Sequence, residues 1–404
     1  MTSAEHDPPE RVAELQQPAE LRQPADLRLF GPAGGAWAAT LAGLHTHAPT
    51  ALALGGGAAL LAGVAYLAAV RRPAGPTTLR WVVAGVLLGV VCGGVATAAR
   101  TAPRDAAPLA ALAQRHAQVA ADLTLTDDPR RLASSGPGPA TLLVPARLTF
   151  VTEQPRGGSP PAAAGVRLDA RVLIFATDPA WRPLLPGQRL VATGRLAPAR
   201  GGDLTAAVLS AAGAPRLRGP PPWVQRAAGR LRTGLQAACA PLPAGPGGLL
   251  PGLVIGDTSR LDPALEEQFR QTGLTHLVAV SGANIAVLLG VVLFVARWCR
   301  AGPWTSAAVC AVALAGFVVL ARPSPSVVRA AVMGLVGLLA LVSGRPLAAA
   351  PALAVAVLAG LLIDPALAVD LGFALSALAT GGLVLLAPRW RDGLRARGVP
   401  AGLA

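Results

Sequence analysis

The sequence contains no lysine, so all 35 of its basic residues are arginine. We attribute this to GC-rich coding and do not read the arginines as selection for phosphate recognition. Charged residues make up only 14% of the chain, and its 21 acids leave a net charge of +14. Such a surplus suits a polyanionic partner or an anionic membrane surface, although in a multispan protein it also sets topology.

Cysteine and histidine are scarce. The four cysteines (Cys92, Cys239, Cys299 and Cys310) lie far apart without a CxxC pair, which predicts buried packing residues rather than disulfides or a metal site. The five histidines form no cluster with carboxylates, so we predict no metal and no cofactor. No P-loop is present, so any directional transport would need a separate motor.

Apolar residues make up 53% of the chain, and its mean hydropathy is +0.52, which indicates a polytopic membrane protein. Residues 1–28 hold six acids and three arginines before the first apolar run. They predict a disordered polar tail rather than a signal peptide.

Apolar runs predict about eight transmembrane helices, since about 20 residues cross the hydrocarbon core. Three runs lie in an N-terminal membrane domain, residues 29–99: 29–44, 50–70 and 79–99. Five lie in a second membrane domain, residues 273–390: 274–296, 304–321, 325–343, 347–363 and 369–387. In the first run, Gly31, Pro32, Gly34 and Gly35 are expected to loosen the helix.

Between the membrane domains, residues 105–218 show the alternation of half-buried strands. The predicted strands are 119–125, 146–150, 166–174, 190–196 and 204–208. About five short strands favour a small β-barrel of the OB type over a sandwich. The predicted fold class is therefore an α-helical polytopic membrane protein with an inserted OB-like β-barrel domain.

Residues 223–272 predict three short elements. Helical spacing of apolar residues from Val224 indicates an interfacial helix. The apolar run 247–256 is too short to cross a membrane, so it is re-entrant or buried in protein. A third helix starts with Asp262 as N-cap and Pro263 as first residue, and ends at Gly273.

Arginines in the connecting loops predict the topology. With the N-terminus in the cytoplasm, the inside loops hold ten arginines, whereas the outside loops 45–49, 322–324 and 364–368 hold only Arg322. This asymmetry follows the positive-inside rule. It predicts an extracytoplasmic β-barrel and a basic cytoplasmic tail, residues 391–404.

Three sequence runs resemble the ComEC family of competence proteins. They are GLVIGDTSRLDPALEEQFRQTGLTHLVAVSGANIAVL (252–288), RPSPSVVRAAVMGLVGLLALVSGRPL (322–347) and LGFALSALATGGLVLLAPRW (371–390). The resemblance implies a channel in the cytoplasmic membrane that imports single-stranded DNA during natural transformation. It also implies a DNA receptor and a cytoplasmic motor as partners, and leaves a homodimer open.

The sequence departs from that family in two places. Many members have SGxH where this chain has Ser281, Gly282, Ala283 and Asn284. Longer members continue into a metallo-β-lactamase-like domain, and no HxHxDH motif occurs in these 404 residues. The chain is therefore expected to be either a fragment or a member without that domain, and it is not predicted to be an enzyme.

A polyanion such as DNA needs a hydrated pathway through the hydrocarbon core, because moving its charges into an apolar medium is very costly. We predict the DNA pathway to be lined by residues at the broken-helix region and in one later span: Asp257, His276, Ser281, Gly282, Asn284 and Arg329. The alternative is that His276, Ser281 and Asn284 only bind neighbouring helices. Arg329 must pair, face water or reach the interface, because arginine at mid-bilayer costs about 2.5 to 3.5 kcal/mol.

Within the barrel, residues 100–218 hold fifteen arginines and eight acids. OB barrels bind single strands through a basic groove with stacking aromatics. The predicted DNA-binding residues are Trp181, Arg182, Arg167 and Arg171. We predict Phe150 and Phe175 to be core residues.

Two other functions compete with the DNA channel. One is a membrane-embedded enzyme that uses His276, Ser281 and Asp257 on a lipid or cell-wall substrate. The other is a structural envelope protein with a ligand-binding barrel, which leaves the polar residues at 273–284 unexplained.

Overall fold

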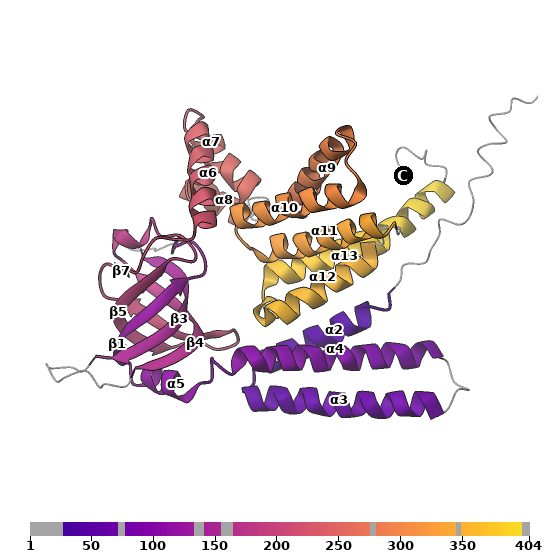
Figure 1. Ribbon diagram of the computed structural model, residues 1–404, viewed down its shortest axis with the longest axis horizontal. Helices are drawn as coiled ribbons and strands as arrows, with labels where there is room; N and C mark the ends of the chain where they lie inside the picture. The colour runs from indigo at the N-terminus through magenta and orange to yellow at the C-terminus, as the bar shows by residue number, and fades with distance from the viewer. Residues whose placement is uncertain are drawn as a thin grey trace, which may run out of the picture.

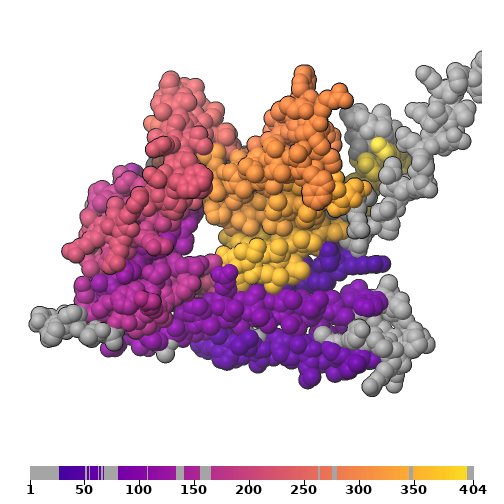
Figure 2. All heavy atoms as spheres, viewed as in Figure 1, coloured from indigo at the N-terminus to yellow at the C-terminus, as the bar shows by residue number. Residues whose placement is uncertain are grey.

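The computed structural model describes residues 27–71, 77–132, 141–154, 165–274, 280–344 and 349–397. A β-sheet domain lies at one end of the molecule, and most of the long helices extend away from it (Figure 1). The space-filling view shows that these two parts touch in some places and leave an opening in others (Figure 2). The predicted polar tail lies almost entirely outside the described residues.

Three helices form the N-terminal membrane region: α2 (Phe30–Leu44), α3 (Ala48–Arg71) and α4 (Thr77–Thr101). Glycines bring the backbones of α2 and α4 into contact. A Cβ atom on Gly93 would lie 2.6 Å from the carbonyl oxygen of Ala36, and one on Gly35 would overlap the Val86 carbonyl. Gly35, one of the residues that we expected to loosen α2, therefore permits close packing, as small residues do between membrane helices.

The sheet domain holds all strands of the described residues: β1 (Gln118–Leu125), β2 (Arg130–Arg131), β3 (Leu142–Glu153), β4 (Val166–Ala176), β5 (Arg189–Pro198), β6 (Thr205–Ala211) and β7 (Arg216–Leu217). The five predicted strands are confirmed as β1, β3, β4, β5 and β6. They pair in the order β1-β3-β4-β6-β5, and β1 also pairs with β5. β4 and β6 run parallel, and the other pairs are antiparallel. The OB classification itself stays a prediction.

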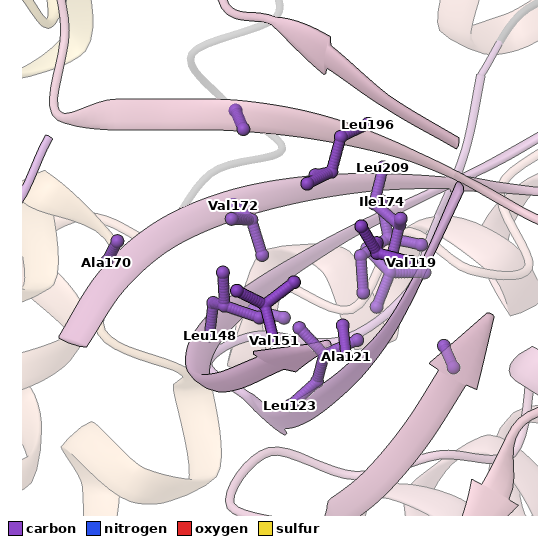
Figure 3. Close-up of a cluster of buried hydrophobic side chains, with 14 of the residues drawn as sticks. Val119, Ala121, Leu123, Leu148, Val151, Ala170, Val172, Ile174, Leu196 and Leu209 are labelled. Atoms are coloured by element: carbon purple, nitrogen blue, oxygen red, sulfur yellow. The ribbon is translucent and has the colours of Figure 1, made fainter. Parts of the chain in front are cut away.

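Alternate side chains of these strands form one apolar core, because successive residues of a strand point to opposite faces. Val119, Ala121 and Leu123 of β1 meet Leu148 of β3 and Ile174 of β4 in this core (Figure 3). The helix α5 (Ala107–Gln114) adds Leu109 and Leu112 to the same core. The alternation in the sequence thus identifies the buried face.

Trp181 corrects one prediction. It ends the short helix η2 (Pro179–Trp181), its side chain is 0% exposed, and its Nε1 atom donates a hydrogen bond to the Gly213 carbonyl at 3.0 Å. A ring enclosed in this way has no face for a nucleic acid base, so its interpretation as a stacking platform is wrong. Phe150 and Phe175, which we placed in the core, are only half-buried.

Three helices link the sheet domain to the second membrane region: α6 (Trp223–Cys239), α7 (Ala244–Ile255) and α8 (Pro263–Gln271). The apolar run 247–256 lies in α7, which is 12 residues long and contains Pro251. α8 starts as predicted, because the Asp262 side chain accepts a hydrogen bond from the Ala264 amide at 3.0 Å. After it, Gly273 adopts φ +71°, which suits glycine.

The second membrane region follows: α9 (Gly282–Trp298), α10 (Pro303–Ala321), α11 (Pro325–Ser343), α12 (Ala349–Ile363), η4 (Pro365–Ala368) and α13 (Leu371–Ala396). α9 begins later than the predicted span 274–296, and α13 extends beyond the predicted boundary at residue 390. Trp37 of α2 joins the two membrane regions. Its Nε1 atom donates to the Ala368 carbonyl at 3.1 Å, and its ring centroid lies 5.4 Å from that of Phe373.

Within the described residues, four helices are long and apolar enough to cross a membrane: Trp81–Thr101, Pro303–Ala321, Pro325–Ser343 and Leu371–Ala396. α9 and α12 are shorter apolar helices. A helical membrane protein is therefore supported, whereas the number of about eight spans stays a prediction.

The cysteines follow the prediction in part. All four are free; Cys239 and Cys310 are buried, and Cys92 is partly buried. Cys299 is exposed, because it lies at the C-cap where α9 has already ended.

We expect Trp181→Ala to lower the free energy of unfolding of the sheet domain by about 3 to 5 kcal/mol, because it empties the centre of a packed core. Hydrogen exchange of the strand amides in the full chain measures this loss. Arg182→Ala is the matched control, since that neighbour is exposed and should change stability by about 0.5 kcal/mol or less. Equal losses in the two variants would contradict this account.

Candidate functional site

The candidate functional site lies at the boundary between the sheet domain and the ends of the membrane helices. All three loops that the topology prediction assigns to the side of the sheet domain contact residues at this boundary. Arg322 binds Asp128, Asp364 binds Arg171, and the Leu44 and Thr46 carbonyls bind Arg104. The three loops therefore lie beside the sheet domain, and their orientation relative to the cell stays a prediction.

Arg322 makes the most specific of these contacts. It follows α10, and its side chain is 9% exposed. Its Nε and Nη2 atoms donate to the two carboxylate oxygens of Asp128, both at 2.8 Å, and its Nη1 atom binds the Gln225 amide oxygen. Planar bidentate pairing of this kind fixes orientation as well as charge. Arg322 has φ +69°, an uncommon conformation for a residue with a side chain.

Arg232 of α6 connects this pair to a second carboxylate. Its Nη2 atom lies 3.6 Å from an Asp128 oxygen and 3.5 Å from an Asp257 oxygen. Its Nη1 atom donates to the Leu320 carbonyl in the last turn of α10 at 2.9 Å. One arginine thus contacts the sheet domain, α10 and the loop that follows α7.

Asp257 is 4% exposed and has its acceptors occupied. It accepts hydrogen bonds from the Ser259 hydroxyl at 2.7 Å, the Ser259 amide at 3.2 Å and the Gln236 side chain at 2.7 Å. Burial alone would raise the pKa of Asp257, but the hydrogen bonds from Ser259 and the charge of Arg232 outweigh it and hold that pKa below 3.8. Asp257 is therefore an ionised anchor and not an open ligand on a path.

We call the four charged residues Asp128, Arg232, Asp257 and Arg322, with the partners Gln225, Gln236 and Ser259, the junction network. Its two arginines balance its two aspartates. A largely buried network with equal charges and filled hydrogen bonds has no spare charge for a ligand. The junction network is a joint between domains.

The polar start of α9 lies beside the joint. The Asn284 side chain donates to the Leu253 carbonyl at 2.8 Å, which satisfies a group that the end of α7 leaves unpaired. Gly282 approaches Ala330 of α11, since a Cβ atom at Gly282 would lie 3.5 Å from the Ala330 side chain. Ser281 is exposed and its side chain forms no cap hydrogen bond. For Asn284, the contact matches the alternative that it binds a neighbouring helix.

Arg329 lies inside the helix bundle and is 6% exposed. Its Nη1 atom donates to the Thr380 hydroxyl at 2.9 Å and contacts the Met333 sulfur at 3.6 Å, and its Nη2 atom binds the Ser376 hydroxyl. Its Nε atom is buried and has no hydrogen-bond partner. Among the described residues no carboxylate forms an ion pair with it, so the partners of Arg329 are two hydroxyl groups and a sulfur, all of them uncharged.

His276 lies outside the described residues. The enzyme alternative loses support from the rest of its proposed set. Asp257 is occupied by its own loop and by α6, and the described contacts of Ser281 include no base. Of the six predicted pathway residues, the five that the structure describes share no side-chain hydrogen bond or ion pair with one another.

The predicted DNA-binding arginines of the sheet domain separate into two kinds. Arg167 and Arg182 are exposed. Arg171 instead donates from its Nη1 atom to Asp364 at 3.1 Å, which ties β4 to the loop before η4. As an interdomain contact, Arg171 is not a free phosphate ligand.

Sequence reasoning missed Asp128, Arg232, Ser376 and Thr380. One signal was present for the joint, because Arg322 is the single arginine of the predicted outside loops. The hydroxyl partners of Arg329 gave no such signal, since serine and threonine are common in membrane helices.

Replacing Arg322 by methionine is expected to lower the free energy of unfolding by about 2 to 3 kcal/mol, because Asp128 loses both of its bidentate bonds. A double-mutant cycle with Asp128→Asn, followed by urea unfolding of the full chain, measures the coupling. Arg130→Met is the control; that arginine pairs with Asp127 at the surface with its side chain 68% exposed, so the loss should stay below about 1 kcal/mol. A coupling near zero for Arg322 would contradict the joint.

The joint should also weaken in acid. Because the pKa of Asp257 is lower in the folded chain than the ordinary 3.8, its stabilisation is complete above that value and is lost as the pH falls through the lower folded value. Hydrogen exchange at residues 256–262 between about pH 5 and pH 3 measures this loss. Asp257→Asn should already exchange faster at the upper pH and respond less to acid; an unchanged slope would refute this role.

The match to a protein family comes from the same region. Residues 253–402 match the family model described as Competence protein. No curated protein and no solved structure matches the chain. The matched residues include the end of α7, the junction residues Asp257 and Arg322, and Arg329. Residues 253–402 are therefore a competence-protein region, in agreement with the resemblance to the ComEC proteins.

Proposed function

We propose that this protein forms a conduit that imports single-stranded DNA across the cytoplasmic membrane during natural transformation. The family match supports a role in competence. The observation that carries the proposal is the guanidinium of Arg329, buried between α11 and α13 without a described counter-charge.

A buried cation of this kind is costly. Arg329 is the fifth residue of α11, and the cost of an arginine in a membrane helix rises from the interface to about 2.5 to 3.5 kcal/mol at the centre. Hydroxyl groups supply hydrogen bonds to it but no negative charge, and the Nε donor stays unused. A residue held at such cost in a membrane helix marks a functional site by default.

A DNA phosphate would supply what Arg329 lacks. It offers one negative charge and several acceptor oxygens, and arginine binds phosphate through paired donors. We propose that the contact of Arg329 with Ser376 and Thr380 belongs to the closed conduit. Separation of α13 from α11 would then free the guanidinium for the phosphates of a passing strand.

We infer that the sheet domain is of the OB type and binds the strand before it enters. The cyclic pairing of the five long strands and the parallel pair β4–β6 support this class. Arg167 and Arg182 remain the proposed phosphate contacts because both are exposed. With Trp181 buried, binding would rest on charge and would weaken steeply with salt.

The topology completes the proposal. The N-terminus lies in the cytoplasm, about eight helices span the membrane, and the sheet domain lies outside. A DNA receptor would deliver the strand to the sheet domain, and a cytoplasmic motor would draw it inward.

Arg329→Gln should lower uptake of labelled DNA by about tenfold or more, because the glutamine keeps hydrogen bonding but removes the charge that attracts phosphate. Arg329→Lys should recover part of the uptake. Uptake is measured in a competent host at matched amounts of protein in the membrane.

Arg395→Gln is the matched control, because this arginine is exposed near the end of α13. Its uptake should stay at the wild-type level. Normal uptake by Arg329→Gln, with the protein present at full amount, would rule out a phosphate contact at Arg329.

A further inference from the structure

A second basic site lies where α4 ends against the sheet domain. The structure contains a cleft of about 220 Å³ there, lined by Arg100 in the last turn of α4, by Arg104 between α4 and α5, and by Arg147, Asp169 and Arg171 of β3 and β4. Figure 2 shows an opening where the sheet domain, α4 and the C-terminal helices meet. Neither the DNA pathway nor the junction network uses this cleft.

The cleft has one positive charge in excess. Three of its four arginines pair with aspartates: Arg104 with Asp105 at 2.8 Å, Arg147 with Asp169 at 3.1 Å, and Arg171 with Asp364 at 3.1 Å. Arg100 is exposed, and no ion pair to it occurs within the described part of the chain. A ligand with a single negative charge would complete the balance.

The paired arginines differ in their free donors. Arg104 is occupied, because its Nη atoms donate to the carbonyls of Leu44, Thr46 and Asp203. It forms a fixed wall of the cleft. Arg147 makes one hydrogen bond, to Asp169, and its side chain is 41% exposed. Since a guanidinium has five N–H donors, Arg100 and Arg147 retain donors for an anion.

The position of the cleft indicates an amphipathic ligand. Arg100 lies in the last turn of Trp81–Thr101, a helix that is long and apolar enough to cross a membrane. Ala99 also lines the cleft, and Leu88 and Val95 precede it on the same helix face at spacings of eleven and four residues. Leu88 is 58% exposed and Val95 is 52% exposed. An apolar strip therefore leads along α4 to the basic cleft.

We propose that this cleft binds the phosphodiester group of a membrane phospholipid, with the acyl chains along Leu88 and Val95. A phosphodiester carries the single negative charge that the cleft lacks and accepts paired hydrogen bonds from arginine. A nucleic acid offers the same phosphodiester group, but it has no acyl chains that would pack against Leu88 and Val95. The bound lipid would connect α4 to β3 and seat the sheet domain on the membrane surface.

Native mass spectrometry of the full chain in detergent tests the proposal with added phosphatidylglycerol. We expect one tightly retained lipid per chain, and about tenfold weaker retention after Arg100→Gln with Arg147→Gln. Arg189→Gln is the control. It also removes an arginine charge, from an exposed position on β5 of the same sheet, and should leave lipid retention unchanged. Equal retention by all variants would overturn the proposal.

A second measurement avoids substitutions. A phosphatidylglycerol with a photoreactive group on its head should label residues 99–104 of the wild-type chain in vesicles. A short single-stranded oligonucleotide should not reduce this labelling. Labelling elsewhere, or its loss on addition of the oligonucleotide, would overturn the assignment to lipid.

Discussion

The bidentate pair between Arg322 and Asp128 is the interaction on which the arrangement of the two domains depends. It joins the turn after β1 to the loop between α10 and α11, and Arg232 extends it to Asp257 and α6. Because both arginines are largely buried and their charges are matched, the joint has a defined geometry and not merely a general attraction. The ion pair of Arg171 with Asp364 attaches the sheet domain at a second point, and Arg104 attaches it at a third by binding the Asp203 carbonyl as well as those of Leu44 and Thr46.

The arginines of this chain, which has no lysine, differ in whether their charge is balanced within the protein. Arginines of the joint have their charge and donors satisfied inside the protein. Arg329 and Arg100 do not, since the first contacts only hydroxyl and sulfur atoms and the second has no described ion pair. Positive charge without an internal partner can bind a phosphate-bearing ligand, so Arg329 and Arg100 are proposed contacts beside the exposed Arg167 and Arg182 of the sheet domain.

The sequence predicts elements better than it predicts contacts. Strands in 105–218, the capped start of α8 and the start of α11 follow from local patterns, since alternation, capping and proline act within a few residues. The prediction for Trp181 was wrong because a tryptophan in a loop between prolines is usually exposed. Here its ring is buried in the core of the sheet domain, and its Nε1 atom donates to the Gly213 carbonyl. Asp128 and Arg322 are 194 residues apart, and no local pattern relates them. The family resemblance, in contrast, rests on motifs that are contiguous in the chain, and the match over 253–402 confirms it.

The hydrogen bond from Asn284 to the Leu253 carbonyl has a mechanical consequence. It connects the first turn of α9 to the last turn of α7. Gly256 and Asp257 follow α7 directly. Any tilt of α9 must either drag α7 along or strand a peptide oxygen without a donor, which costs about 1 to 3 kcal/mol if it is shielded from water. Motion of α9 would thereby pass to α7 and, through the ion pairs of Arg232 with Asp257 and Asp128, to the sheet domain.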